Sequence, residues 1–552
     1  MAEILKTTVG YLLDEVASKL PGKEFLVDIP KGKRYSYEEF LAVVNQMARG
    51  FLKLGVIQGE HVALWAPNFS EWITTEFAIA KIGAVLVSVD TNVQIQQLEY
   101  LLKQSDSRFL IMAEGLKGSE YLEMIHKLCP EISHSIAGRL NCHALPELKN
   151  LVLISDRIHQ GMFNWGHLLE MGKIVPDPVL TERQRSCQMD DVVTLLYTSG
   201  TTGSPKGVMS THYGIINTTL ASVENQRLTA KDRLCLSVPL SHMFGSVCVT
   251  LAAVSKGATL VIPSETFNAR RILEAIEKEQ CTAIYGSPNA FITLMDDPQF
   301  ETLDIKSLRT GIMGGAQCPM EVMKKIVEEM GVEEIVIGYG QTEASSWITE
   351  TSPDDPLELR VSTVGRPLSG VEVKVIDSRS GQEVPTGVMG EICARGFNMK
   401  GYYKMPAATV NAIDAEGWLH TGDLGNIDGL GYLRTTGRLK EVINKAGETI
   451  YPTEVEEVLF SHPKILNAQV FGVPDKIVGE EIAVWIKLEE GAEVTEEEIL
   501  HYCRGKLLDS HTPRYLKLVK EFPMTPLGKA QKFRMREIAI NEYGLGDSKG
   551  SE

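Results

Sequence analysis

A run of small and hydroxyl-bearing residues follows an apolar segment near the middle of the chain. Residues 198–207 read TSGTTGSPKG, directly after the apolar run 192–197. Glycines let the backbone turn tightly and aim N–H groups at anionic oxygens, while hydroxyls and a lysine add donors and positive charge. The pattern predicts a phosphate-binding loop built from Thr198, Ser199, Gly200, Thr201, Thr202, Gly203 and Lys206.

Two other interpretations of this loop are weaker. In a Walker A loop the lysine follows a glycine and precedes a serine or threonine, whereas here Lys206 lies between Pro205 and Gly207. The sequence therefore argues against a P-loop kinase or GTPase. A plain flexible turn would need only two or three such residues.

Four further segments place acidic, hydroxyl or basic side chains beside glycines. They are GGA at 314–316, YGQTE at 339–343, TGD at 421–423 with GR at 437–438, and PLGKAQK at 526–532. A carboxylate such as Glu343 suits Mg²⁺, which prefers one or two carboxylates beside phosphate oxygens. An acceptor and a donor such as Asp423 and Arg438 suit hydroxyl groups. Each segment alone would be an ordinary strand end, turn or surface lysine.

Taken together and in this order, these segments resemble the signature of the adenylate-forming superfamily, which includes acyl-CoA synthetases, luciferases and the adenylation domains of peptide synthetases. The likeness covers essentially the whole chain and is weakest in 111–148. It implies an AMP-forming acid–CoA ligase, in which ATP activates a carboxylic acid as an acyl-adenylate and coenzyme A then takes the acyl group. ATP, Mg²⁺ and coenzyme A are the implied cofactor and co-substrates.

The resemblance also assigns roles to single residues. It implies that Tyr339 stacks on adenine, that Thr342 touches the α-phosphate and that Glu343 holds Mg²⁺. The pair Asp423 and Arg438 would grip the ribose hydroxyls. The other implied nucleotide-binding residues are Gly315, Ala316, Gln317, Gly338, Gly340 and Gln341.

Lys529 matches the C-terminal lysine that the family uses to stabilise charge as the carboxylate attacks the α-phosphate, a role that suits a preorganised cation. The implied catalytic residues are Lys529, Thr198, His242 and Glu343. In the family a C-terminal domain rotates between the two steps, and the matching hinge residue is Lys440. Lys445, Ala446 and Gly447 would lie beside the thiol channel, with Ala446 where a glycine is common.

The acyl pocket of the family is lined by the helix that matches residues 241–253 here. No Asp or Glu occurs from Ser241 to Ser264, so a substrate with an α-ammonium group would lack a buried partner. The apolar character of this helix favours an apolar acyl group, although its side chains would also suit a helix core. The expected pocket residues are His242, Met243, Phe244, Val247, Ile312, Gly314, Gly340 and Trp347.

The text around 308–365 is most similar to the medium-chain acyl-CoA synthetase branch, so a medium-chain fatty acid is the first expectation for the substrate. An aryl or alicyclic acid such as benzoate is the alternative, because Phe244 and Trp347 could wall a ring. A non-catalytic ATP-binding scaffold is the alternative of another class. The presence of both Lys529 and Glu343 argues against it.

These residues must be positioned by alternating helices and strands. Helical periodicity at 40–56 and 72–85 alternates with apolar runs at 61–67 and 86–89, which is typical of a parallel sheet covered on both faces. We expect an α/β fold: a large N-terminal domain (1–437) of two α/β layered subdomains plus a smaller β subdomain, a hinge at 438–440, and a small mobile α+β C-terminal domain (441–552).

Composition narrows the function classes. The chain has 552 residues and a formal net charge of −17, which argues against a nucleic-acid partner. Its nine cysteines form no CxxC pair and have no histidine at metal-binding spacing, so they are expected to be reduced core residues. The start lacks a basic end and an apolar core, and no run is long enough to span a membrane. We expect a cytoplasmic enzyme, with a homodimer left open.

Overall fold

The computed structural model describes residues 4–116, 120–198, 205–316, 318–489, 491–524 and 530–545. The chain forms two compact units, one of Met1–Val373 with Ala394–His420 and one of Lys374–Cys393 with Thr421–Glu552. The expected boundary at 438–440 lies inside the second unit. A division at that point therefore stays a prediction.

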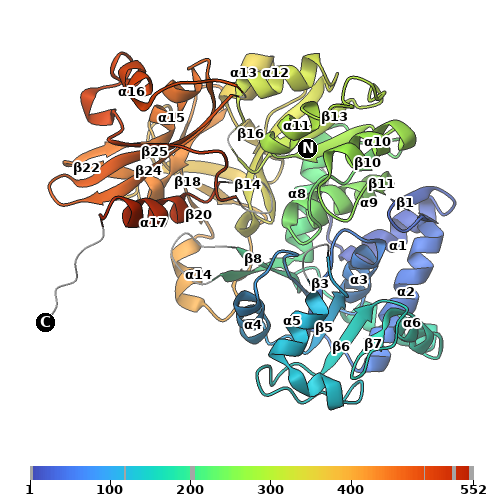
Figure 1. Ribbon diagram of the computed structural model, residues 1–552. Helices are drawn as coiled ribbons and strands as arrows, with labels where there is room; N and C mark the ends of the chain where they lie inside the picture. Colours follow the sequence, from blue (N-terminus) through green and yellow to red (C-terminus); the bar gives the residue numbers. More distant parts are fainter. Residues whose placement is uncertain are drawn as a thin grey trace, which may run out of the picture. The chain divides into compact units, whose positions relative to one another are not determined.

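The first unit contains a nine-stranded sheet in the order β16-β15-β14-β13-β12-β10-β11-β1-β2. Figure 1 labels β16, β14, β13, β10, β11 and β1 of this sheet. The strands from β1 to β14 in this order run parallel, and β2, β15 and β16 are added antiparallel at the two edges. The strands are β1 Glu24–Asp28, β2 Lys33–Ser36, β10 Arg233–Cys235, β11 Thr259–Ile262, β12 Ala283–Gly286, β13 Thr310–Gly314, β14 Glu334–Gln341, β15 Ser346–Glu350 and β16 Arg366–Pro367.

Both faces of this sheet are buried. Neighbouring residues of a strand point to opposite faces, so each reports the packing of one face. On β12, Ile284 packs in one core with helices α10 Ala269–Glu279, α11 Pro288–Met295 and α12 Met320–Glu328. Its neighbour Tyr285 packs in the other core of the unit. The result is the expected parallel layer covered on both sides.

A second sheet of the same unit has eight strands in the order β19-β9-β8-β4-β3-β5-β6-β7. Its central strands are parallel, whereas β9 pairs antiparallel with β8 and with β19. The strands are β3 His61–Trp65, β4 Val85–Ser88, β5 Phe109–Ala113, β6 Asn150–Ile154, β7 Phe163–Asn164, β8 Val192–Thr198, β9 Lys206–Thr211 and β19 Gly401–Tyr402.

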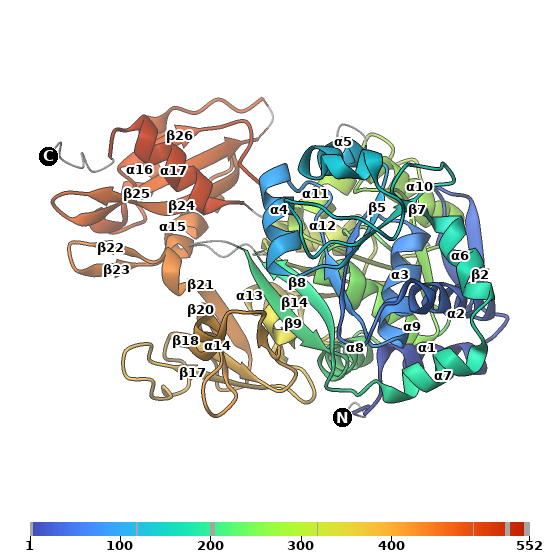
Figure 2. The same ribbon diagram turned by 90° about the horizontal axis from the view of Figure 1, so that it is seen from below.

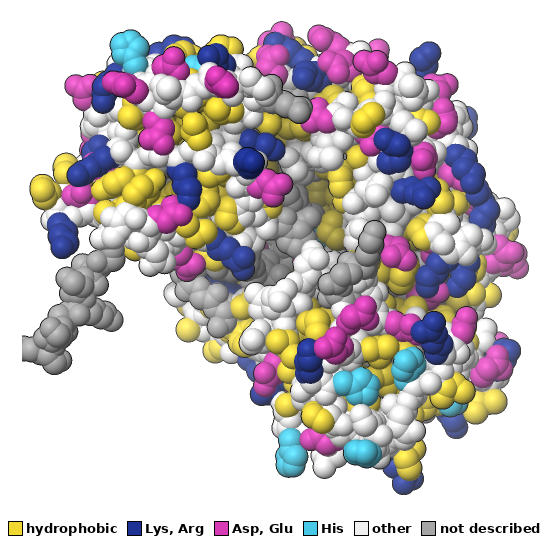
Figure 3. All heavy atoms as spheres, in the orientation of Figure 1, with side chains coloured by type: hydrophobic (Ala, Val, Ile, Leu, Met, Phe, Trp, Pro, Cys, Tyr) yellow, Lys and Arg dark blue, Asp and Glu magenta, His cyan; other side chains and the backbone are white. Residues whose placement is uncertain are grey.

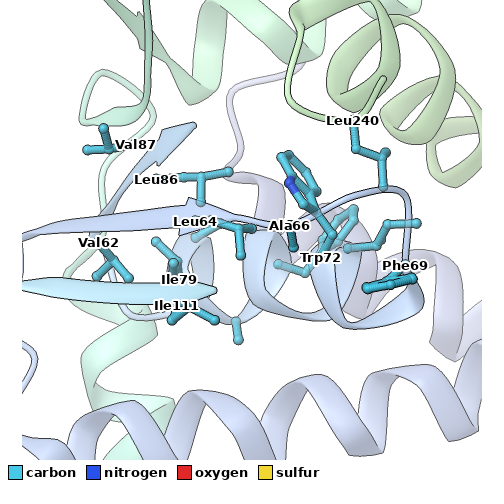
Figure 4. Close-up of a cluster of buried hydrophobic side chains, with 14 of the residues drawn as sticks. Val62, Leu64, Ala66, Phe69, Trp72, Ile79, Leu86, Val87, Ile111 and Leu240 are labelled. Carbon is cyan, nitrogen blue, oxygen red and sulfur yellow. The ribbon is translucent and has the colours of Figure 1, made fainter. Parts of the chain in front are cut away.

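Helices cover this second sheet. Figure 4 shows the packing of α3 Ser70–Lys81, whose Trp72 and Ile79 lie among buried strand residues such as Leu64 and Ile111. The other helices of the unit include α1 Val9–Lys19, α2 Tyr37–Leu54, α4 Ile95–Gln104, α5 Tyr121–Leu128, α6 Trp165–Lys173, α7 Asp177–Ser186 and α8 His212–Asn225. The alternation expected between residues 40 and 89 is confirmed by α2, β3, α3 and β4.

Local sequence explains where these helices begin and end. A capping box starts α2, because the Ser36 hydroxyl accepts from the Glu39 N–H and the Glu39 carboxylate accepts from the Ser36 N–H. The helix stops at Gly55, whose left-handed backbone (φ 89°) suits glycine at a helix end.

The second unit begins in a four-stranded sheet, β17-β18-β20-β21. A five-stranded sheet follows, and Figure 2 shows α15, α16 and α17 packed beside it. Helices α15 and α16 contribute to a core on one side, while Met535 and Ala539 of α17 join a core with Phe471 and Trp485. The elements are β17 Glu372–Ile376, β18 Gly390–Arg395, β20 Leu419–Ile427, β21 Leu433–Arg438, β22 Ile443–Lys445, β23 Glu448–Ile450, β24 Ile465–Asp475, β25 Gly479–Leu488, β26 Tyr515–Leu518, α15 Pro452–Phe460, α16 Glu496–Arg504 and α17 Lys532–Glu542.

The expected fold class is confirmed, with layered α/β sheets in the large part of the chain and a smaller α+β part at the C-terminus. Strand β26 and helix α17 were not expected from the sequence. Within the described residues, no helix combines the length and the apolar character that crossing a membrane would require.

Candidate active site

The two ends of the predicted phosphate loop form an antiparallel hairpin between β8 and β9, in which Thr198 pairs with Lys206. Helix α4 supports this hairpin from the side. The Tyr100 hydroxyl donates to the Pro205 carbonyl oxygen (3.1 Å), and the Tyr197 hydroxyl donates to the Gln104 side chain. The loop residues Ser199, Gly200, Thr201, Thr202 and Gly203 lie outside the described residues.

Tyr402 connects the hairpin to the predicted magnesium ligand. Its hydroxyl donates to Glu343 Oε1 (2.8 Å), and the Lys206 ammonium lies 4.8 Å from the centre of its ring. This juxtaposition follows from the pairing of β19 with β9, which sets Tyr402 opposite Val208. Sequence reasoning missed Tyr402, because nothing near it in the chain indicates a partner 59 residues away.

The surroundings keep Tyr402 in its donor form. Burial and the negative charge of Glu343 raise the pKa of the Tyr402 phenol well above its ordinary value. The backbone of Glu343 is also held, because its carbonyl oxygen accepts from the Met399 N–H (2.7 Å). A carboxylate that accepts one hydrogen bond retains lone pairs for a cation, so Glu343 fits the oxygen chemistry of Mg²⁺.

Two glycine-rich strand ends lie beside each other in the nine-stranded sheet. Gly314 at the end of β13 pairs with Gly338 in β14, and the exposed residues Gly315 and Ala316 follow. Gly315 has a φ of 81°, which favours glycine. The carboxyl ends of parallel strands are where ligands bind in open α/β sheets. Gln317 lies outside the described residues.

Trp347 lies against these glycines. A Cβ placed on Gly338 or on Gly314 would approach the indole ring to 3.0 Å, and one on Gly340 would lie 1.9 Å from the Ser346 carbonyl oxygen. The Trp347 indole can therefore pack against β13 and β14, and the β14–β15 hairpin can form, only because positions 314, 338 and 340 are glycines. The segment YGQTE spans this hairpin: Tyr339, Gly340 and Gln341 end β14, and Thr342 and Glu343 form a short 3₁₀ turn.

The turn ends in strained backbone. Ser345 and Ser346 have φ values of 57° and 126°, a region that residues other than glycine rarely adopt. Helix α8 holds them in place, because the Thr218 hydroxyl shares a 2.9 Å hydrogen bond with the Ser346 hydroxyl. Such strain clusters at ligand-binding sites in proteins.

Two of the residues expected to line the acyl pocket, Phe244 and Trp347, form an aromatic cluster with a third ring. The Phe244 ring meets the Trp347 ring edge to face, with centroids 5.3 Å apart, and lies 6.3 Å from the Tyr285 ring. Tyr285 was not expected from the sequence. Met243, Val247 and Ile312 are buried in the same core, so this cluster is also part of the packing between the layers.

The expected helix at 241–253 is wound differently from an α-helix. Residues Phe244–Leu251 form a π-helix (η2), which continues into α9 Ala252–Lys256. Gly245 allows the close approach of η2 to the preceding segment, since a Cβ there would lie 2.3 Å from the Pro239 carbonyl oxygen. π-helical turns are frequent at functional sites.

His242 stands at the start of this segment, and its protonation is fixed by its surroundings. Its Nδ1 accepts a hydrogen bond from the Phe244 N–H (3.0 Å), and burial lowers its pKa to about 4. At neutral pH the ring is therefore uncharged and carries its proton on Nε2. It can donate one hydrogen bond to an oxygen of a bound acid.

In the second unit, Asp423 and Arg438 lie opposite each other on β20 and β21. Arg438 Nε is 3.2 Å from Asp423 Oδ1. The structure thus brings together the pair that was expected to grip the ribose. The aspartate holds the guanidinium at a partly exposed position on the sheet.

The predicted hinge and channel residues come shortly after Arg438 in the chain. Lys440 lies in the 3₁₀ turn Leu439–Glu441 (η4). Lys445 is not a free cation, because its Nζ lies 2.5 Å from Glu481 Oε1. Ala446 and Gly447 form the two-residue turn between β22 and β23 with φ values of 52° and 85°. Lys529 lies outside the described residues.

Comparisons with known proteins agree with this architecture. The family model of the AMP-binding enzyme matches residues 13–403, and that of the AMP-binding enzyme C-terminal domain matches residues 454–529. The chain belongs to the AMP-binding enzyme family. The comparisons confirm the expected enzyme class. The chain is an AMP-forming acyl-CoA ligase that uses ATP, Mg²⁺ and coenzyme A.

Individual relatives cover nearly its full length. The Bacillus subtilis (strain 168) protein named "Putative acyl-CoA synthetase YngI" is 45% identical over 99% of this chain and 100% of its own. The Danio rerio protein "Medium-chain acyl-CoA ligase ACSF2, mitochondrial" is 37% identical over 98% of this chain and 89% of its own.

Among solved structures, ATP-bound MatB from Rhodopseudomonas palustris superposes on this AMP-binding enzyme with a TM-score of 0.84 and 25% identity, covering 97% of this chain and 99% of that one. The anthranilate CoA ligase AuaEII in complex with anthranoyl-AMP has a TM-score of 0.84 and 25% identity, covering 98% and 99%.

Proposed function

We propose that this AMP-binding enzyme activates a medium-chain fatty acid and transfers it to coenzyme A. The observation that carries the proposal is the apolar aromatic cluster of Phe244, Trp347 and Tyr285, which belongs to the same core as buried Met243 and Val247. Such a lining favours an apolar acyl group. The relative named a medium-chain acyl-CoA ligase supports the same substrate class.

The phosphate loop and the segment 339–343 would bind the triphosphate. In this proposal the loop from Thr198 to Lys206 receives the phosphates, Thr342 contacts the α-phosphate and Glu343 holds Mg²⁺, oriented by Tyr402. When bound, Mg²⁺ neutralises negative charge on phosphate oxygens. The side chain of Tyr339, with the backbone of 314–316, 338 and 340–341, forms the wall for the base.

The reaction begins with attack of the acid. The carboxylate oxygen attacks the α-phosphorus and pyrophosphate leaves, giving the acyl-adenylate. His242 donates its Nε2–H to an oxygen of the acid and orients it, and it remains neutral throughout. Asp423 and Arg438 bind the ribose hydroxyls, and Lys529 stabilises the negative charge that develops on the transferred phosphate.

The second step transfers the acyl group. The sulfur of coenzyme A attacks the acyl carbonyl carbon, the bond between the acyl carbon and the phosphate oxygen breaks, AMP leaves and the thiol proton passes to solvent. We propose that residues 441–552 move about Lys440 between the two steps, as the family resemblance implies, and that Lys445, Ala446 and Gly447 then line the thiol channel. A turn at a strand end that absorbs a dihedral change is a normal hinge.

An aryl acid is the second candidate substrate. It is favoured by the flat Trp347 surface over Gly314 and Gly338 and by the likeness to an anthranilate CoA ligase. The two candidates share the ATP chemistry and differ only in the group that fills the aromatic cluster.

Pyrophosphate release with MgATP, with and without coenzyme A, tests the proposal across acetate, hexanoate, octanoate, palmitate, benzoate, cyclohexanecarboxylate and mixed amino acids. We expect the highest kcat/KM with hexanoate or octanoate, together with consumption of coenzyme A. A maximum with benzoate would replace the substrate assignment by the aryl acid. Silence with every acid would contradict catalysis and favour an ATP-binding scaffold.

A further inference from the structure

A thiol and carboxylate cluster lies in the first unit, in the segment that connects β5 to β6. Helix α5 ends at Leu128, and the 3₁₀ turn Pro130–His134 (η1) follows. Figure 3 shows histidine side chains gathered on the face of the molecule that carries this segment. None of its residues belongs to the proposed active site.

Three potential ligands converge there. Cys129 Sγ, Cys142 Sγ and a carboxylate oxygen of Glu131 all lie within 4.8 Å of one another. The two cysteines are 0% and 1% exposed. Their spacing in the chain, C-x-E-x₁₀-C, is no common metal motif, which is why the sequence predicted only reduced core cysteines.

The backbone holds the carboxylate in place. Glu131 Oε1 accepts from the His143 N–H (3.2 Å), which ties η1 to the loop that carries Cys142. The Glu131 carbonyl oxygen accepts from the Ser135 hydroxyl (2.7 Å). Glu131 Oε2 is buried and, in the part of the chain that the structure describes, has no partner beyond the Cys129 thiol beside it. A thiol is a weak hydrogen-bond donor, so this buried carboxylate oxygen is poorly satisfied and a cation at this position would stabilise it.

We propose that Cys129, Glu131 and Cys142 bind a Zn²⁺ ion. Thiolate and carboxylate are both zinc ligands, and three protein ligands leave a fourth tetrahedral position for solvent or for another side chain. The exposed His143 directly follows Cys142 and could supply it. The ion would fasten the end of α5 and η1 to the loop before β6, so its role would be structural.

Binding requires both thiols as thiolates, so their two protons pass to solvent as the ion enters. The charge of the three ligands is then −3, which the ion reduces to −1. A disulfide between the same cysteines would need an oxidant and would exclude the ion. The number of free thiols therefore distinguishes the reduced cysteines that can bind the ion from a disulfide, which would remove two of them.

Cobalt titration of the reduced full-length chain, first stripped with a chelator, tests the site. We expect one equivalent of Co²⁺ to give the intense visible bands of a tetrahedral ion and a sulfur-to-cobalt charge-transfer band, with release of two protons, and Zn²⁺ to abolish both bands. Absence of the charge-transfer band would refute the proposal, as would seven free thiols instead of nine in the chain as purified.

Variants separate ligation from folding. Cys142→Ser and Glu131→Gln should each weaken Co²⁺ binding by roughly tenfold or more, at least the loss typical of outer-shell changes. Cys187→Ser, which removes a buried cysteine (6% exposed) of the same unit outside the cluster, is the matched control and should bind Co²⁺ normally. Glu131→Gln keeps both buried thiols and so remains informative if Cys142→Ser does not fold. Equal weakening in the control, or none in Glu131→Gln, would overturn the assignment.

Discussion

The protonation state of Glu350, a buried residue near Tyr285 of the aromatic cluster, provides the sharpest test. Its side chain is buried (4% exposed), and it accepts hydrogen bonds from the Ser222 hydroxyl and the Asn225 amide (3.0 Å) of α8. The neighbouring titratable groups are Tyr285 and Cys248, both of which stay neutral at physiological pH. No ion pair to its carboxylate is found among the described residues, and burial raises its pKa to about 8 from the ordinary 4.5.

The sign and size of the effect follow from linkage. The folded chain keeps this proton while the unfolded chain loses it, so the stability contribution is full below about pH 4.5 and is lost as the pH rises toward 8. One pKa unit corresponds to about 1.4 kcal/mol, which gives a ceiling of about 5 kcal/mol and about 3 kcal/mol at pH 7. Glu350→Gln has the same shape and no proton to lose.

Glu350→Gln should therefore be less stable than the wild type at pH 5, where its amide N–H₂ faces the Asn225 donor at a cost of about 1 to 3 kcal/mol. It should match or exceed the wild type at pH 8. Urea unfolding followed by tryptophan fluorescence at several pH values measures this crossing, and Glu328→Gln, at an exposed position of α12, is the matched control. Parallel pH profiles for wild type and Glu350→Gln would refute the assignment of a buried neutral carboxyl.

Three further outcomes follow from the site. Tyr402→Phe removes a charged hydrogen bond and should lower the adenylation rate about 10- to 100-fold, with partial rescue by added Mg²⁺. The control is Tyr403→Phe, because the Tyr403 hydroxyl donates to Asp106 instead, and this variant should change the rate little. Equal losses in the two variants would contradict a role of Tyr402 in orienting Glu343. Trp347→Ala should move the best substrate in the pyrophosphate assay toward longer acids, and an unchanged optimum would place the pocket elsewhere. Ala446→Gly should relieve left-handed strain of about 1 kcal/mol, so stopped-flow thioester formation from supplied acyl-AMP should be as fast or faster; a slower step would mean that this alanine contributes a contact.

Local sequence determined much of the frame. Alternating hydrophobic periods predicted α2, β3, α3 and β4, because each period reports the burial of one helix stripe or of a whole strand. The apolar run before TSGTTGSPKG predicted β8, and YGQTE could be placed at a strand end, the end of β14, from the chain alone. Asp423 and Arg438 meet across one hairpin, where only a short connection separates them.

The tertiary structure decided the contacts that depend on register between distant strands. Tyr402 reaches Glu343 and Lys206 only because β19 pairs with β9, and the Trp347 indole rests on Gly314 because β13 and β14 lie side by side. Cys129, Glu131 and Cys142 converge through the folding of a long connection. No local period encodes such pairings, since a shift of one residue in register would turn each side chain to the other face of its sheet. The sequence thus indicated the motif residues that could act, whereas the packing of the sheets determined which of them meet and added residues, such as Tyr402 and Tyr285, that no local pattern indicated.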